Sequence, residues 1–91
     1  MVIWTDGARR DLDEIHAYIA REASPGIATK VAASIAQAAR LLDQFKGLGR
    51  ATDIENVREY VVPRYRSYII GYTVRDQDTV ILRIRHARQN R

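Results

Sequence analysis

The sequence predicts an α+β domain in which a helix hairpin packs on one face of a small, mainly antiparallel sheet, in the order β-α-α-β-β-β. Apolar residues recur every three or four positions through the first half of the chain, which is the period of amphipathic helices. Near Asn56 the period falls to two, which is typical of strands. The 91 residues suffice for one core, so we expect a single domain over residues 1–91.

The first strand and the first helix follow from local preferences. The β-rich run Val2-Ile3-Trp4-Thr5 predicts a strand, and Asp6 offers an N-cap for the helix after it. The apolar stripe of that helix consists of Ala8, Leu12, Ile15 and Ile19.

The second helix has a clear start signal and a regular stripe. Serine at the cap and proline at the first helical position, as in Ser24-Pro25, favour a helix start. Gly47 and Gly49 indicate its end. Its stripe consists of Ala28, Val31, Ile35, Ala38, Leu42 and Phe45.

Three strands fill the second half. They are expected at residues 56–62, 68–74 and 79–85. Pro63 ends the first, and the short turn 76–78 joins the last two, so we predict an antiparallel meander. A helix hairpin covers only one face of such a sheet, which leaves the other face open.

The last strand alternates apolar and basic residues. Simple alternation places Val80, Leu82 and Ile84 on the core face. It places Ile81, Arg83 and Arg85 on the open face. We therefore expect Val31, Ile35, Leu42, Leu82 and Ile84 to be buried together. The arginines indicate an acidic partner, and a solvated sheet face with a basic tail is the simpler alternative.

The net charge of +4 comes entirely from the second half of the chain. Residues 1–49 carry six basic and six acidic side chains, whereas residues 50–91 carry nine basic and five acidic ones. All nine of those basic residues are arginines, which pair bidentately with carboxylate or phosphate. The partner is therefore a nucleic acid or an acidic protein segment, and composition alone does not choose between them.

Several classes of protein are not expected. The chain has no cysteine, which excludes disulfides and thiolate zinc sites. His16 and His86 lie on different predicted elements, so we expect no metal site. We find no apolar run long enough for a membrane span and no signal-peptide pattern. A cytoplasmic protein that needs no cofactor and contacts no membrane is expected.

Five segments together carry a resemblance to a known family. They are residues 8–19, Gly49-Arg50, Val57-Arg58-Glu59, 65–72 and 80–88. In this order and at this spacing, nearly the whole chain resembles the RelE/ParE family of bacterial type II toxin–antitoxin toxins. The resemblance implies the fold predicted above. It also implies a cognate antitoxin as partner, with a small acidic segment that binds the toxin.

The family has two activities, and the resemblance is closer to one of them. RelE-like members cut messenger RNA within the ribosome, whereas ParE-like members poison DNA gyrase. Metal-free RNA cleavage needs a proton acceptor, cations for the charged phosphorane and an acid for the leaving oxygen. RelE-like toxins draw these partly from an arginine early in the central strand. Ile69 takes that place here, which resembles the ParE side, unless a bulge moves Arg66 into it.

The candidate residues differ between these activities. On the ParE-like interpretation no residue is assigned as catalytic, and the residues expected to bind the target or the antitoxin are Arg58, Arg83, Arg85 and Arg88. On the RelE-like alternative, an endoribonuclease, the candidate catalytic residues are Arg66, His86 and Arg88. A histidine that hydrogen-bonds the helix layer is the simpler interpretation of His86. Arg58 and Glu59 are expected to point to opposite faces of their strand, so they should not form an ion pair.

A third hypothesis lies outside the family. The arginine face could belong to a small nucleic-acid-binding domain. The last strand lacks the aromatic side chains on which bases stack, which argues against this hypothesis.

Overall fold

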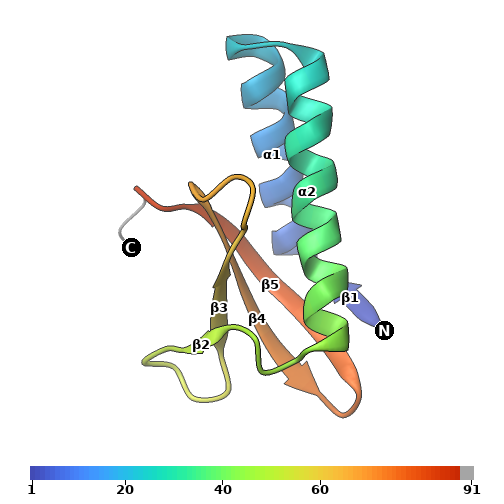
Figure 1. Cartoon of the computed structure of the whole chain (residues 1–91), viewed down its shortest axis with the longest axis vertical. Coiled ribbons are helices and arrows are strands. Elements are labelled where there is room, and N and C mark those ends of the chain that lie inside the picture. The colour runs from blue at the N-terminus through green and yellow to red at the C-terminus, as the bar shows by residue number, and fades with distance from the viewer. Residues whose placement is uncertain (89–91) are drawn as a thin grey trace.

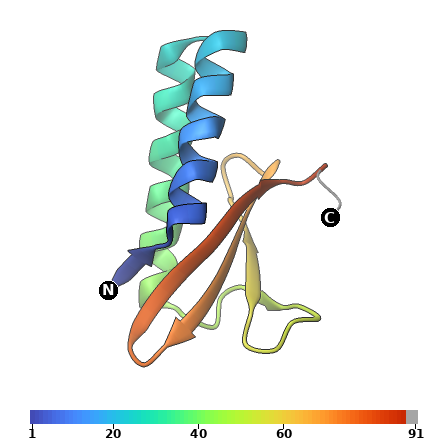
Figure 2. The same cartoon turned by 180° about the vertical axis from the view of Figure 1, so that it is seen from behind.

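The computed structural model describes residues 1–88 and confirms the predicted α+β architecture (Figure 1). Its elements are β1 (Val2–Trp4), α1 (Asp6–Glu22), α2 (Pro25–Gln44), β2 (Arg50–Ala51), β3 (Arg58–Val61), β4 (Tyr68–Arg75) and β5 (Asp78–His86). The two helices form a hairpin beside the sheet, and the view from behind shows β5 running beneath α1 toward the C-terminal end (Figure 2). The strand β2 was not predicted, because two residues are too few to show a period.

The sheet has five strands in the order β1-β5-β4-β3-β2. The meander of β3, β4 and β5 is antiparallel, as predicted. The first strand lies at the sheet edge, where it runs parallel to β5. The short strand β2 pairs with β3 at the opposite edge.

Thr5, rather than Asp6, is the N-cap of α1, so the predicted cap is wrong by one residue. The Thr5 hydroxyl accepts a hydrogen bond from the Ala8 N–H at 3.1 Å. The same hydroxyl lies 2.9 Å from the Ile81 carbonyl, to which it can donate, so the cap also ties α1 to β5. In α2 the predicted cap is confirmed, because the Ser24 hydroxyl accepts from the Ile27 N–H at 3.1 Å.

The stripe of α2 forms the centre of the core, with one exception. Its members Ala28, Val31, Ile35, Ala38 and Leu42 are all buried. Phe45 was expected beside them, but its side chain is 58% exposed. It is the C-cap residue with a non-helical backbone (φ −127°, ψ 78°), so it no longer follows the helical stripe.

A bulge in β5 corrects the predicted faces of the last strand. The register steps from Gly71↔Arg83 to Tyr72↔Ile81, which leaves Leu82 as the extra residue. Ile81 is therefore fully buried, whereas Leu82 is only half-buried. The prediction was wrong for these two residues because strict alternation cannot continue through a bulge. Beyond it, Ile84 is buried as predicted.

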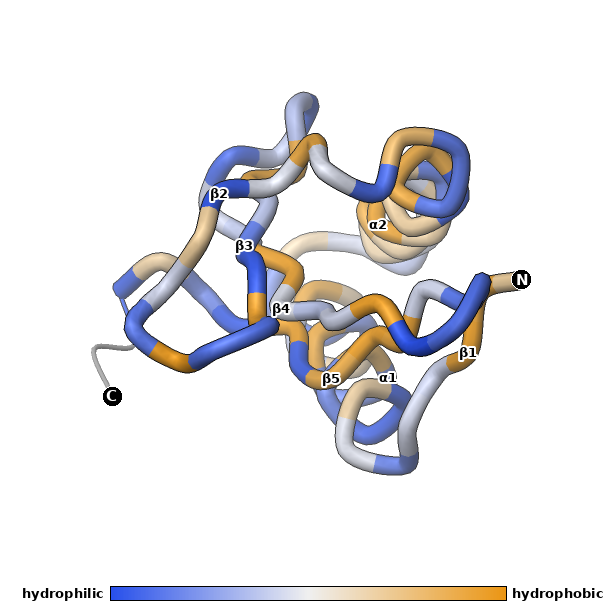
Figure 3. The backbone as a smooth tube through the Cα atoms, turned by 90° about the horizontal axis from the view of Figure 1, so that it is seen from below, coloured by the Kyte–Doolittle hydropathy of each residue, from blue (hydrophilic) through white to orange (hydrophobic). Residues whose placement is uncertain are grey.

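The helix hairpin extends past the sheet, so the outer part of α1 has no strand beneath it (Figures 1 and 2). Ala8 is the one buried residue of α1, and this helix packs on both α2 and β5. Figure 3 shows hydrophobic segments of β5 beside α1. Within residues 1–88, neither helix is long and apolar enough to cross a membrane.

Candidate functional site

Arg83 reaches the helix layer instead of the open sheet face. Its Nε donates to the Asp11 carboxylate of α1 at 2.7 Å. The same carboxylate accepts the Ile84 N–H at 2.9 Å, beyond the point where β1 stops pairing with β5. The Asp11 carboxylate raises the pKa of Arg83. Asp11 thus fixes both the β5 edge and the arginine, whose side chain is still 68% exposed.

Arg85 and Glu59 form an ion pair across the sheet. The Arg85 guanidinium lies 3.2 Å from the Glu59 carboxylate, and the two side chains are 33% and 23% exposed. The register places both residues on the face opposite the buried Ile70 and Tyr72. The positive charge of Arg85 on the open face is therefore largely balanced by the Glu59 carboxylate of the same chain.

Arg58 lies on the other face from Glu59, as predicted, and the two do not pair. Arg58 is opposite Tyr72 in the register and donates to the Gly49 carbonyl. The buried Tyr72 hydroxyl accepts from the Gly49 N–H at 2.8 Å and donates to the Lys46 carbonyl at 2.8 Å. Arg58 therefore helps to order the loop after α2, and it is only half exposed.

A cleft of about 470 Å³ lies between α1 and the end of β5. Its polar lining consists of Asp11, Glu14, Tyr18, Tyr68, Arg83, His86 and Arg88. The rings of Tyr68 and His86 meet edge to face, 5.4 Å apart. The His86 Nδ1 accepts the Arg88 backbone N–H at 3.1 Å. Burial, followed by the nearby Tyr18, raises the pKa of Tyr68.

Arg66 does not take the place of the missing arginine in β4. It lies in the loop before β4 and lines a different hollow from His86 and Arg88. The only register shift between β4 and β5 lies at Gly71 and Tyr72, well after Arg66, and Ile69 stays opposite Arg85. The three ribonuclease candidates therefore do not line one pocket.

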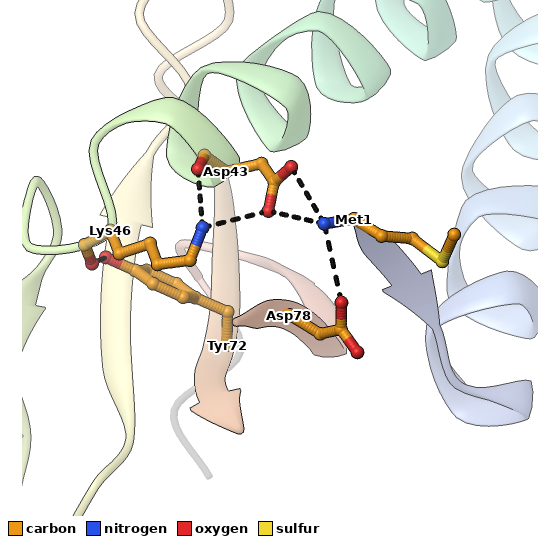
Figure 4. Close-up of polar contacts among 5 residues, drawn as sticks. All are labelled: Met1, Asp43, Lys46, Tyr72 and Asp78. Atoms are coloured by element: carbon orange, nitrogen blue, oxygen red, sulfur yellow. Dashed lines mark hydrogen bonds and ion pairs between the residues drawn. The ribbon is translucent and has the colours of Figure 1, made fainter. Parts of the chain in front are cut away.

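The opposite end of the sheet carries a cluster of charges (Figure 4). The Asp43 carboxylate lies 3.1 Å from both the Lys46 Nζ and the α-amino group of Met1. The hydrogen bond from Lys46, and next the one from the α-amino group, lowers the pKa of Asp43 to about 2. Asp78 contacts the same amino group at 3.4 Å. Through the α-amino group of Met1, this cluster ties α2 to the start of β5. No set of three or more side chains suited to a metal occurs in residues 1–88.

A second groove, which the sequence did not indicate, lies between α2 and the loop after β3. It measures about 530 Å³, and Arg40 and Arg64 are its charged lining residues. Sequence reasoning missed it because Arg40 belongs to the electrically balanced first half of the chain. The one signal that could have indicated it was the composition of α2, in which Asp43 is the single acidic residue.

Comparisons with known proteins agree with one another. Residues 2–91 match the model of a family described as the ParE toxin of the type II toxin–antitoxin system parDE. A candidate toxin of Sinorhizobium fredii, Y4kP, is 40% identical over 86 residues, which cover 94% of this chain and 86% of that protein. A solved structure of the chromosomal ParDE toxin–antitoxin system from P. aeruginosa aligns with a TM-score of 0.84 and 28% identity. The alignment covers 93% of this chain and 92% of that one.

Proposed function

This chain belongs to the ParE toxin family of type II toxin–antitoxin systems, and from that premise we propose that it inhibits DNA gyrase. An antitoxin is implied as its partner by the ParDE system that it resembles. We propose further that an acidic segment of this antitoxin neutralises the toxin, and that the toxin acts in the cytoplasm. The chain would bind gyrase and would not itself cleave nucleic acid.

The observation that carries this proposal is the pairing of the β5 arginines with carboxylates of the same chain. Arg83 is held by Asp11, and Arg85 by Glu59. Stabilising a phosphorane needs cations aimed at the charge that develops during the reaction. Cations already matched by nearby carboxylates are poorly suited to that task. They remain suitable for contacts with a protein surface, where paired charges set orientation and specificity.

Among the candidate binding residues, the exposed ones are proposed to meet the target. Arg83 and Arg88 present exposed side chains beside the cleft at the end of β5. Arg85 lies on the adjoining sheet face. Arg58, which is bound to the Gly49 carbonyl, would contribute by ordering the loop after α2.

A ribosome-dependent endoribonuclease remains the alternative, because His86, Arg88 and Tyr68 share one cleft. His86 would be the proton-transfer group, since histidine is the side chain that most often acts as a general acid or base. Arg88 would face the phosphate. Arg66 would have to act from a separate hollow.

Purified components can separate the two activities. The chain is incubated with gyrase and relaxed plasmid DNA, and in parallel with ribosomes that are translating a messenger RNA. We expect that supercoiling is lost and that gyrase-linked DNA breaks appear, while the messenger RNA stays intact.

The matched pair of variants is His86→Ala and the double variant Arg83→Glu with Arg85→Glu. We expect the first to keep gyrase inhibition and the second to lose it while remaining folded. Messenger RNA cleavage that falls about 10²–10⁴-fold in His86→Ala, as loss of a general acid or base does, would establish the ribonuclease instead.

A further inference from the structure

We infer that the loop between β2 and β3 inserts the Ile54 side chain into an apolar pocket, bordered by basic side chains, on the protein target of the toxin. This inference deepens the proposed function, because it rests on a protein target and adds a second contact to the arginines of β5. The segment, here called the Ile54 loop, comprises residues 52–57. It follows the edge strand β2 and stands away from both helices (Figures 1 and 3).

The Ile54 side chain is large and apolar, yet it lies in water. It is 65% exposed, and among the large apolar side chains of residues 1–88 only Met1 is more exposed. Single apolar side chains are common on protein surfaces, so exposure alone does not indicate a contact. The order of the loop, the hollows beside it and the charges at its tip distinguish this isoleucine.

Hydrogen bonds within the loop fix the position of Ile54. The Thr52 hydroxyl accepts from the Ile54 N–H at 3.1 Å, and the Ile54 carbonyl accepts from the Val57 N–H at 3.1 Å. The backbone of Asn56 lies in the left-handed region that asparagine tolerates (φ 67°), and its carbonyl accepts from the Thr73 hydroxyl of β4. A side chain that is already held in place loses little conformational freedom when it binds, which favours affinity.

Two hollows flank the Ile54 loop, and Ile54 lines both of them. One measures about 340 Å³ and is shared with Arg58 and Tyr72. The other measures about 520 Å³ and is shared with Asp53 and Glu59, on the opposite face of β3. The loop is therefore a ridge that a partner can contact from two sides. A projecting side chain that fills a pocket of the partner is a common anchor of protein interfaces.

The tip of the Ile54 loop is acidic in a chain with a net charge of +4. Asp53 and Glu55 flank Ile54, both are exposed, and neither is in an ion pair within residues 1–88. Arg50 and Arg58 lie in the strands at the base of the loop. Carboxylates on both sides of an apolar side chain are complementary to cations around the pocket that receives it. Nucleic acid and an acidic antitoxin segment both have the wrong charge for this tip, which favours the target as its partner.

The Ile54 loop also adjoins the surface that is proposed to meet the target. Glu59 lines the larger hollow together with Ile54, and its carboxylate holds Arg85 on the open sheet face. One partner can therefore contact the loop and Arg85 at the same time. It would present cations to the loop and carboxylates to the arginines of β5. Such an alternation of charge fixes the orientation in which two proteins bind.

The first test compares two isoleucines that receive the same substitution. Ile54→Asp is the test variant, and Ile27→Asp is the matched control, because Ile27 is 46% exposed in the first turn of α2. Ile54→Val keeps a branched apolar side chain at the tip. Each full chain is titrated into a gyrase supercoiling assay, its affinity for the antitoxin of its own operon is measured by calorimetry, and its thermal unfolding is recorded.

We expect half-inhibition of gyrase to need about tenfold more Ile54→Asp than wild type, since burial of an isoleucine side chain contributes on this scale. Ile27→Asp and Ile54→Val should inhibit as the wild type does. All three variants should keep the antitoxin affinity and the melting temperature. Normal inhibition by Ile54→Asp would overturn the inference and leave the proposed function standing. An equal loss in Ile27→Asp would also overturn it.

The second test reverses the charge of the tip. The double variant Asp53→Lys with Glu55→Lys is compared with Asp13→Lys and Glu22→Lys, which make the same change in net charge at exposed sites of α1. We expect only the first to lose inhibition, and the loss should shrink as salt rises, because salt screens exposed charges. Equal inhibition by the two double variants would contradict the basic border of the pocket.

Growth arrest on expression separates this inference from the choice of gyrase. If the wild type arrests growth without affecting gyrase, the proposed target is wrong, and the loop is then decided by whether Ile54→Asp still arrests growth. Retained arrest would overturn the inference, and lost arrest would support it. Loss of antitoxin binding with normal inhibition would assign the loop to the antitoxin instead. Self-association of the wild type that Ile54→Asp abolishes would assign it to a second copy of the chain. A wild type without either effect would contradict both proposals.

Discussion

The bulge in β5 makes a sharp prediction about two neighbouring residues. Leu and Ile each lose three carbon atoms on replacement by alanine, so the transfer free energy of the removed atoms is nearly the same. The difference between Ile81→Ala and Leu82→Ala therefore reports burial. Ile81 is 0% exposed and belongs to the core, whereas Leu82 is half-buried.

We expect Ile81→Ala to lower the free energy of unfolding by about 2–5 kcal/mol, as a large-to-small change at a closed core site does. We expect Leu82→Ala to cost less than about 1.5 kcal/mol, because partly exposed side chains lose less on truncation. At about 4–8 °C per kcal/mol for a domain of this size, the first variant should melt at least about 8 °C below the wild type.

Urea denaturation measures both variants, with the slope of the free energy against urea as a check that each unfolds in two states. Ile35→Ala serves as the reference, since Ile35 is also 0% exposed at the centre of α2. If Leu82→Ala cost as much as Ile81→Ala, or more, the strand would alternate without interruption and the inference of a bulge would be wrong.

Three further perturbations follow from single contacts. Tyr72→Phe leaves the buried Gly49 N–H without its acceptor and should cost about 1–3 kcal/mol in urea denaturation; an unchanged midpoint would refute the role of the hydroxyl. The Asp43 pKa of about 2 lies below its unfolded value of about 3.9. Asp43 therefore contributes stability above about pH 4 that is lost as the pH falls toward 2. Melting curves of Asp43→Asn should show a weaker fall over that range, and an identical fall would contradict this account. Glu59→Gln removes a half-exposed partner of Arg85 and should lower stability by about 1 kcal/mol or less, and a larger loss of melting temperature would mean that the pair acts as a buried one.

The sequence by itself determined the fold class, because its signals are local. The stripe of α2 is set by the helical period, and the Ser24-Pro25 start signal is a matter of adjacent residues. The change to a period of two indicated β3, β4 and β5, whose observed bounds differ from the expected ones by at most two residues. The family resemblance was visible for the same reason, since it depends on the order of short segments.

Only the tertiary structure decided what the arginines contact, because their partners are far away in the sequence. Arg83 is 72 residues from Asp11, and Arg85 is 26 residues from Glu59. The bulge at Leu82 depends on how β5 pairs with β4, and no property of β5 alone specifies that register. The groove between α2 and the loop after β3 likewise exists only because the packing of that loop beside α2 brings Arg40 and Arg64 to one rim. A charge count shows how many arginines a chain has, whereas only the folded contacts determine which of them an acidic partner can still reach.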